Sequence, residues 1–165
     1  MEQTQELIIT RVYNAPRELV YKAWTDAEAL AQWWAPTGMS LTVKKLDFRP
    51  GGIFHYRQVL PNGEPLWGIF IYQDMQEPEY INFVNSFADE EGNRVRSPFH
   101  QAWPLEILNE VSFEEKHGKT TLTLKGRPIN ATTEEIQIFV ANKPSMNGGF
   151  KGVLDKLEEY LANNQ

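Results

Sequence analysis

The stretch LDFRPGGIFHYRQVLPNGEPLWGIFIY, residues 46–72, decides the fold, because apolar and polar residues alternate between two tight turns. The turns are RPGG at 49–52 and PNGE at 61–64, and the runs beside them are rich in aromatic and β-branched residues. Short runs of this kind, joined by glycine turns, are typical of antiparallel strands in a meander. Two adjacent lysines, Lys44 and Lys45, interrupt the alternation just before this stretch and predict a β-bulge.

More strands are expected on both sides of the meander. YINFVNSFA at 80–88 continues it, and the runs at 105–115 and 119–127 form a hairpin around KHGK. The segment ELIITRVYN at 6–14 is a further strand near the start of the chain. Between 89 and 104 the alternation stops, which indicates a long polar connection with aromatic residues near its end.

Helices are expected at two places. Residues 14–34 contain two short ones, the first opening at Asn14 and Pro16 and the second capped by Asp26. Residues 128–165 follow a helical period, and the spacing of Thr132 and Glu135 fits a capping box. Pro144 lacks an amide donor, so it must kink or split this closing helix.

This order of elements predicts an α+β fold, in which a curved antiparallel sheet of about seven strands wraps a long C-terminal helix. Two short helices follow the first strand. The length of 165 residues, without a visible linker or repeat, predicts a single domain over residues 1–165.

Composition excludes several classes of protein. The formal net charge of −6 and the lack of a basic stripe argue against nucleic-acid binding. The absence of cysteine removes disulfides and thiolate metal sites, and the three histidines show no metal-ligand spacing. No apolar run reaches the roughly 18 residues of a membrane helix. We therefore expect a cytoplasmic protein that does not insert into membranes and needs no metal or cofactor.

Several motifs resemble one family over nearly the whole chain. They are APRELVYKAWTDAEALAQWWAP at 15–36, LDFRPGGIFHY at 46–56, PNGEPLWGIFIY at 61–72, VSFEEKHGKTTLTL at 111–124 and GGFKGVLDKLEEYL at 148–161. The sequence is similar to domains that resemble the C-terminal domain of the activator of the heat-shock chaperone 90 ATPase. That family is part of the START-like superfamily, also called Bet v 1-like or SRPBCC, which has the helix-grip fold.

The resemblance implies an apolar cavity between the long helix and the sheet, so a non-enzymatic domain that binds a small apolar or amphipathic ligand is the leading interpretation. The resemblance also implies two alternatives. One is a cyclase- or hydrolase-type enzyme with His100, Glu106 and Tyr56 as acid–base candidates, and the other is a chaperone-regulating interaction domain. A chaperone partner is the less favoured, because the chain shows nothing like the separate N-terminal module of the eukaryotic co-chaperone.

Strand parity suggests some of the side chains that line such a cavity. Phe54, Tyr56 and Gln58 share a face of their strand, as do Phe83, Asn85 and Phe87 of theirs. In the run at 66–74 both faces are apolar, so parity cannot choose between them, and we select Phe70 and Tyr72 over Trp67, Ile69 and Ile71. The same side chains could instead simply fill the core. The residues that we expect to contact a ligand are Phe54, Tyr56, Phe70, Tyr72, Phe83, Phe87, His100, Trp103, Met146 and Phe150.

The segment SPFHQAWPLEI, residues 97–107, is the candidate mouth of the cavity. A solvated loop has little use for Phe99 and Trp103, so both are expected to anchor it, with His100 as a polar contact.

Overall fold

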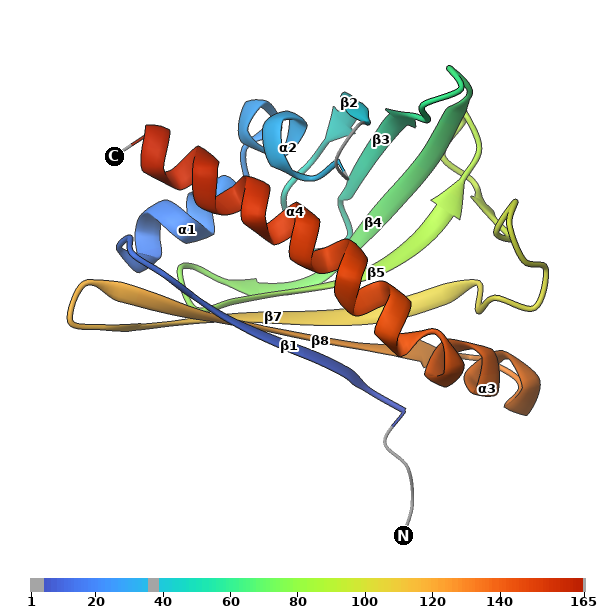
Figure 1. Cartoon of the computed structure of the whole chain (residues 1–165). Helices are drawn as coiled ribbons and strands as arrows, with labels where there is room; N and C mark the ends of the chain where they lie inside the picture. The colour runs from blue at the N-terminus through green and yellow to red at the C-terminus, as the bar shows by residue number, and fades with distance from the viewer. Residues whose placement is uncertain (1–4, 36–38, 165) are drawn as a thin grey trace, which may run out of the picture.

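The structure, a computed structural model, describes residues 5–35 and 39–164 (Figure 1). Its strands are β1 (Leu7–Tyr13), β2 (Ser40–Leu46), β3 (Ile53–Val59), β4 (Pro65–Gln76), β5 (Tyr80–Ala88), β6 (Arg94–Val95), β7 (Glu106–Lys116) and β8 (Lys119–Ile129). Its helices are α1 (Arg17–Ala23), α2 (Ala27–Trp33), α3 (Thr133–Ala141) and α4 (Lys143–Asn163).

All the strands belong to one antiparallel sheet with the order β1-β8-β7-β5-β4-β3-β2, and β6 pairs with the end of β5. This confirms the predicted α+β fold with a curved antiparallel sheet and two short helices after the first strand. The prediction missed β6, because two residues are too few to show an alternating pattern.

The predicted irregularities of the meander have clear local causes. The β2–β3 register shifts between Val43 and Lys45, which confirms the bulge. In the turn before β3, Gly51 has φ +84°, a conformation that favours glycine. At Gly52 the requirement is space, since a Cβ atom would lie 2.0 Å from the carbonyl oxygen of Asp47.

The closing helical segment is divided in two. The capping box is present at its start, where Thr132 accepts a hydrogen bond from the Glu135 amide and the Glu135 side chain accepts one from the Thr132 amide. α3 ends at Ala141, Asn142 lies between the two helices, and α4 begins at Lys143, with Pro144 in its first turn. Proline is tolerated there because the first amides of a helix have no intrahelical partner. The prediction that Pro144 kinks or splits the segment is therefore confirmed.

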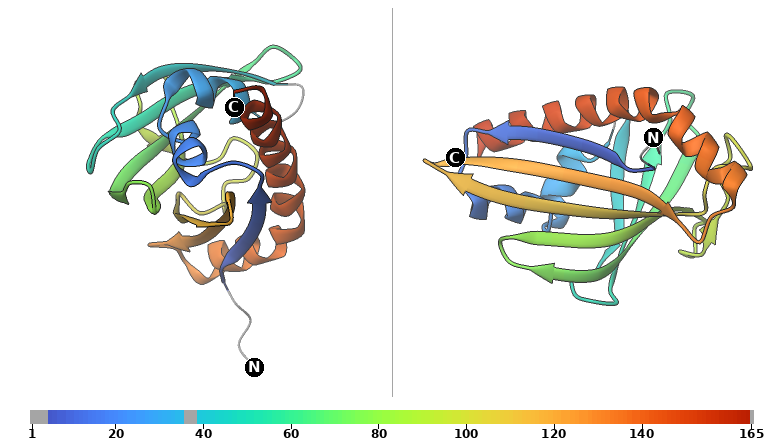
Figure 2. Two further views of the ribbon diagram at one scale, coloured as in Figure 1. Left: turned by 90° about the vertical axis from the view of Figure 1, so that its left-hand side faces the viewer. Right: turned by 90° about the horizontal axis from the view of Figure 1, so that it is seen from below.

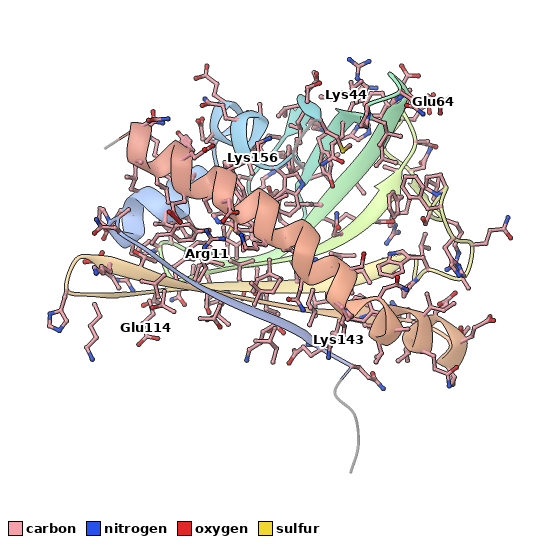
Figure 3. The ribbon with its side chains drawn as sticks, viewed as in Figure 1. Arg11, Lys44, Glu64, Glu114, Lys143 and Lys156 are labelled. Atoms are coloured by element: carbon pink, nitrogen blue, oxygen red, sulfur yellow. The ribbon has the colours of Figure 1, made fainter. Side chains whose placement is uncertain are left out.

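Helix α4 crosses the open side of the curved sheet, as the two views of Figure 2 show, and its C-terminal half is held at several points. The Tyr13 hydroxyl of β1 donates to the Leu154 carbonyl at 3.1 Å. The Arg11 guanidinium pairs with Asp155 and, at 3.0 Å, with Glu158. On the other side, Lys156 donates to the Ala35 carbonyl at 2.8 Å (Figure 3). These bonds fix α4 between β1 and the end of α2.

The aromatic core lies at the end of the sheet that α1 and α2 cover. Three tryptophans at the ends of the short helices contact one another edge-on or tilted, at centroid distances of 4.7–5.8 Å. They are Trp24 just after α1, Trp33 at the end of α2 and Trp34 just after it. Trp33 is completely buried, and its indole N–H donates to the Ala23 carbonyl at 2.9 Å. Below them, Phe70 of β4 stacks on Phe83 of β5 at 4.0 Å. The two short helices therefore close this end of the sheet.

No helix within residues 5–35 and 39–164 combines the length and the apolar character that crossing a bilayer requires.

Candidate functional site: a cavity beneath helix α4

A cavity of about 360 Å³ lies between the N-terminal half of α4 and the sheet. Its wall consists mainly of apolar and aromatic side chains, with a few neutral polar groups. The residues that line it are Trp34, Tyr56, Gln58, Leu66, Trp67, Gly68, Asn85, Ser86, Phe87, Phe99, Trp103, Pro104, Leu105, Ile107, Met146, Gly149, Phe150 and Val153.

The antiparallel register brings the floor of the cavity together from three strands. Tyr56 of β3 faces Gly68 of β4, and Gly68 faces Phe87 of β5. The second half of β3, the first half of β4 and the second half of β5 therefore meet at one end of the sheet. α1 and α2 cover the other end, so the cavity lies where these helices do not reach.

Polar groups converge on the middle of this floor. The Asn85 side-chain amide donates to the Ile69 carbonyl at 3.1 Å and lies 3.5 Å from the Tyr56 hydroxyl. The Gln58 amide donates to the Trp34 carbonyl at 3.4 Å. An apolar wall with a few fixed polar groups is the usual composition of a small-molecule site.

Burial raises the pKa of the Tyr56 phenol, while hydrogen bonds from Trp34 and Asn85 act in the opposite direction. The net effect is a raised pKa, so Tyr56 remains a neutral phenol at physiological pH. It can donate a hydrogen bond there but carries no charge.

The loop between β6 and β7 forms one side of the mouth and is tied to α3. Arg96 donates to Glu135 at 2.8 Å and to the Trp103 carbonyl at 3.3 Å. Glu135 is the capping-box residue of α3, so one carboxylate both caps the helix and holds the loop. The Trp103 ring lies 5.7 Å from the Phe139 ring of α3. These contacts hold Trp103 against the cavity.

The structure brings five of the ten expected contact residues to the cavity wall, namely Tyr56, Phe87, Trp103, Met146 and Phe150. Four others, Phe54, Phe70, Tyr72 and Phe83, share the inward face but lie outside the lining, nearly fully buried. Parity identifies the face of a strand and not the position along it. These four lie toward the end where Trp24 and Trp34, which directly follow the two short helices, cover the sheet.

His100 also lies outside the lining, because it is exposed and its Nδ1 accepts a hydrogen bond from the Ala102 amide at 3.1 Å. Glu106, another of the acid–base candidates, pairs with Arg94 and accepts a hydrogen bond from the Asn130 side chain. Phe99 corrects a second expectation. Its side chain is 66% exposed at the cavity mouth, so Trp103 anchors the loop and Phe99 does not.

Several lining residues were not among the expected contacts. Trp34, Leu66, Ile107 and Val153 gave no signal that separates a cavity wall from a core. Gly68 did give one, since a glycine inside a strand often marks the close approach of another group. Here that group is Tyr56, whose Cζ and hydroxyl oxygen lie 2.4 Å from the place that a Gly68 Cβ would occupy.

The lining contains no acidic, basic or histidine side chain among the residues that the structure describes. Charged residues such as Lys44, Glu64 and Glu114, labelled in Figure 3, belong to strands or turns at the periphery of the sheet. The described ranges also contain no group of three or more His, Asp or Glu side chains arranged to hold a metal ion. The site therefore offers hydrogen bonds and apolar surface.

The buried tyrosines predict a loss of stability in alkali. Burial raises the pKa of Tyr21 to about 12 and that of Tyr13, Tyr56 and Tyr72 above the ordinary range. In the unfolded chain these phenols lose their protons near pH 10. The contribution of the buried tyrosines to the free energy of unfolding is therefore fully present below that pH and is lost as the pH rises further. Absorbance and circular dichroism followed together should show these phenols ionising as the chain unfolds. Complete tyrosine ionisation near pH 10 in a folded chain would contradict this.

Comparison with known proteins places the chain in a family. The sequence profile of the Activator of Hsp90 ATPase homolog 1-like protein matches residues 14–162. No match was found among curated proteins. A crystal structure of a Mycobacterium smegmatis protein is similar at 27% identity and a TM-score of 0.78, covering 96% of this chain and 91% of that one.

Two solution structures show the same architecture. One, from Staphylococcus epidermidis, has 26% identity and a TM-score of 0.76, covering 100% of this chain and 94% of the other. The second, from Arthrobacter aurescens, has 21% identity and a TM-score of 0.81, with coverages of 98% and 90%. The arrangement of sheet and long helix fits the helix-grip fold of the Bet v 1-like superfamily. The chain therefore belongs to the family of Activator of Hsp90 ATPase homolog 1-like proteins.

Proposed function

We propose that this protein binds a small apolar or amphipathic molecule in the cavity beneath α4 and does not transform it. The observation that carries this proposal is the cavity itself, about 360 Å³ with a largely apolar wall. That volume lies within the roughly 300–1,000 Å³ of small-molecule sites. Trp103 and Phe150 would cover the ligand from the loop and the helix.

The polar groups favour binding over catalysis. An acid–base mechanism needs groups that exchange protons near the working pH, within reach of the substrate. Tyr56 keeps its proton because burial raises its pKa, while His100 and Glu106 bond elsewhere. The three candidates for a cyclase or hydrolase therefore do not converge on the cavity.

The family name raises a chaperone partner, but the surface gives little support for one. Among the described residues, the exposed large apolar side chains are Ile8, Val12 and Phe99, which come from two separate segments. A stable protein interface needs a larger apolar centre than such isolated side chains.

The two neighbouring glycines of α4 provide a matched test. A Cβ atom at either Gly148 or Gly149 would meet nothing within 4 Å, so a side chain can be added at both. Only Gly149 lines the cavity. Gly149→Phe should therefore obstruct the cavity, whereas Gly148→Phe adds the same side chain next to it.

Amide NMR titration with fatty acids, flavonoids, sterols and aromatic polyketides would measure the effect. With a compound that binds, we expect shifts around Tyr56, Phe87, Trp103 and Phe150. Gly149→Phe should weaken binding at least about tenfold, and Gly148→Phe should leave it unchanged. The proposal fails if no compound shifts these amides or if both variants bind as the wild type does.

A further inference from the structure

The cavity floor carries a fixed pair of polar groups, built across three strands. Tyr56 of β3 extends over Gly68 of β4, where a Cβ atom would lie 2.4 Å from its hydroxyl oxygen. This lack of a side chain lets the phenol approach Asn85, which lies on β5. Both residues line the cavity.

The orientation of the Asn85 amide is set by the backbone. Its nitrogen donates to the Ile69 carbonyl at 3.1 Å. A carbonyl can only accept, so the amide cannot be flipped without placing two oxygens together. The same nitrogen lies 3.5 Å from the Tyr56 hydroxyl. The N–H groups of the Asn85 side chain therefore bond to the protein, and its Oδ1 is left as an acceptor.

The Tyr56 hydroxyl has the complementary role. The Asn85 amide donates to its oxygen at 3.5 Å, so within the protein this oxygen acts as an acceptor. In the described part of the chain the phenol proton meets no protein acceptor, and Asn85 Oδ1 meets no protein donor. The pair thus presents one donor and one acceptor to whatever occupies the cavity.

A charged ligand would be poorly matched to this wall. No described lining residue carries a charge that could pair with a carboxylate or an ammonium group. Burying an unpaired charge costs far more than a neutral hydrogen bond returns. The wall therefore selects against fatty acids and other ionised amphiphiles.

From these contacts we propose that the cavity selects an uncharged aromatic molecule carrying a hydroxyl group, or another group that both donates and accepts. Its polar end lies on Tyr56 and Asn85, and its apolar body extends toward Trp103, Met146 and Phe150. This inference rests on the proposed binding function and specifies the class of ligand.

Three probes with the same ring system isolate the polar contact. They are 2-naphthol, the uncharged 2-methylnaphthalene and the ionised 2-naphthoate, titrated at neutral pH and followed by amide NMR. One or two neutral hydrogen bonds correspond to roughly a five- to tenfold gain in affinity. We expect 2-naphthol to exceed 2-methylnaphthalene by that factor, and 2-naphthoate to bind more weakly than either.

Two tyrosine variants then assign the effect. Tyr56→Phe should remove the advantage of 2-naphthol and leave the affinity for 2-methylnaphthalene unchanged. Tyr72→Phe is the matched control, because it deletes a buried hydroxyl that lacks a hydrogen-bond partner and lies outside the lining. The Tyr72→Phe variant should still bind 2-naphthol more tightly than 2-methylnaphthalene.

The outcomes separate the two proposals. Equal binding of 2-naphthol and 2-methylnaphthalene would overturn the inferred ligand class and leave the binding function standing. Tighter binding of 2-naphthoate than of 2-naphthol would also overturn the inferred ligand class. So would a Tyr56→Phe variant that still binds 2-naphthol more tightly than 2-methylnaphthalene. Absence of binding by all three probes would overturn the inferred ligand class, whereas the binding function itself fails only if the wider set of compounds also leaves the cavity amides unshifted.

Discussion

Replacing Trp33 by Ala should lower the free energy of unfolding by about 3–5 kcal/mol. Trp33 is completely buried and contacts Trp24 and Trp34 at centroid distances of 4.7 and 5.5 Å. Truncation would leave a large void among rigid rings, and the Ala23 carbonyl would lose its indole donor. Urea unfolding followed by circular dichroism measures the loss.

Trp103→Ala is the matched control for this substitution. Trp103 is only partly buried and contacts one aromatic ring, that of Phe139. Its removal should therefore cost clearly less than the removal of Trp33. Equal losses for the two variants would show that the tryptophans near α2 do not form the centre of the core.

The second large effect is expected for Gly68→Ala. An added Cβ would lie 2.4 Å from the Tyr56 ring, which itself packs against Phe54 and Phe70 at 4.8 and 5.8 Å. Because these neighbours restrict the ring, we expect a loss of about 1–3 kcal/mol in stability. Displacement of the phenol should also remove the preference for 2-naphthol.

The control is Gly148→Ala, where an added Cβ meets nothing within 4 Å. Alanine is the better helix former, so this variant should gain up to about 1 kcal/mol. Urea unfolding and the naphthol titration, applied to both variants, give a direct comparison. If Gly68→Ala kept both wild-type stability and the preference for 2-naphthol, Tyr56 would not lie over β4 as described.

Much of the fold could be predicted because its signals are local. Alternation and the turn glycines identified the meander, the lysine pair marked the bulge between Val43 and Lys45, and Pro144 marked the division of the closing helix. Each of these features depends on a few adjacent residues. The family resemblance then supplied the arrangement of the sheet around the helix.

The candidate site was only half predictable, because its position along the sheet depends on contacts distant in sequence. Phe70 and Tyr56 share a face, yet Phe70 lies under Trp34 at 5.0 Å while Tyr56 reaches the cavity. Which of the two lines the cavity depends on how far the short helices and Trp34 extend over the sheet. Similarly, the role of Asn85 depends on its hydrogen bond to the Ile69 carbonyl, which fixes the orientation of the amide and cannot be read from the sequence.

The loop at 97–107 shows the same limit. Two aromatics in a polar segment suggested two anchors, but an aromatic can also border a cavity with its ring exposed. Phe99 does this, 6.1 Å from the Phe87 ring, while Trp103 is held by the contacts of Arg96 and Phe139. Nothing in the local pattern distinguishes the two.

The most direct measurement is of intermolecular nuclear Overhauser effects between bound 2-naphthol and the protein. If the cavity beneath α4 is the binding site, the ring protons of the probe should show contacts to Met146, Phe150 and Ile107, which line it from the helix and from β7. Contacts to exposed apolar side chains such as Ile8 and Val12 in their place would show surface binding and contradict the account.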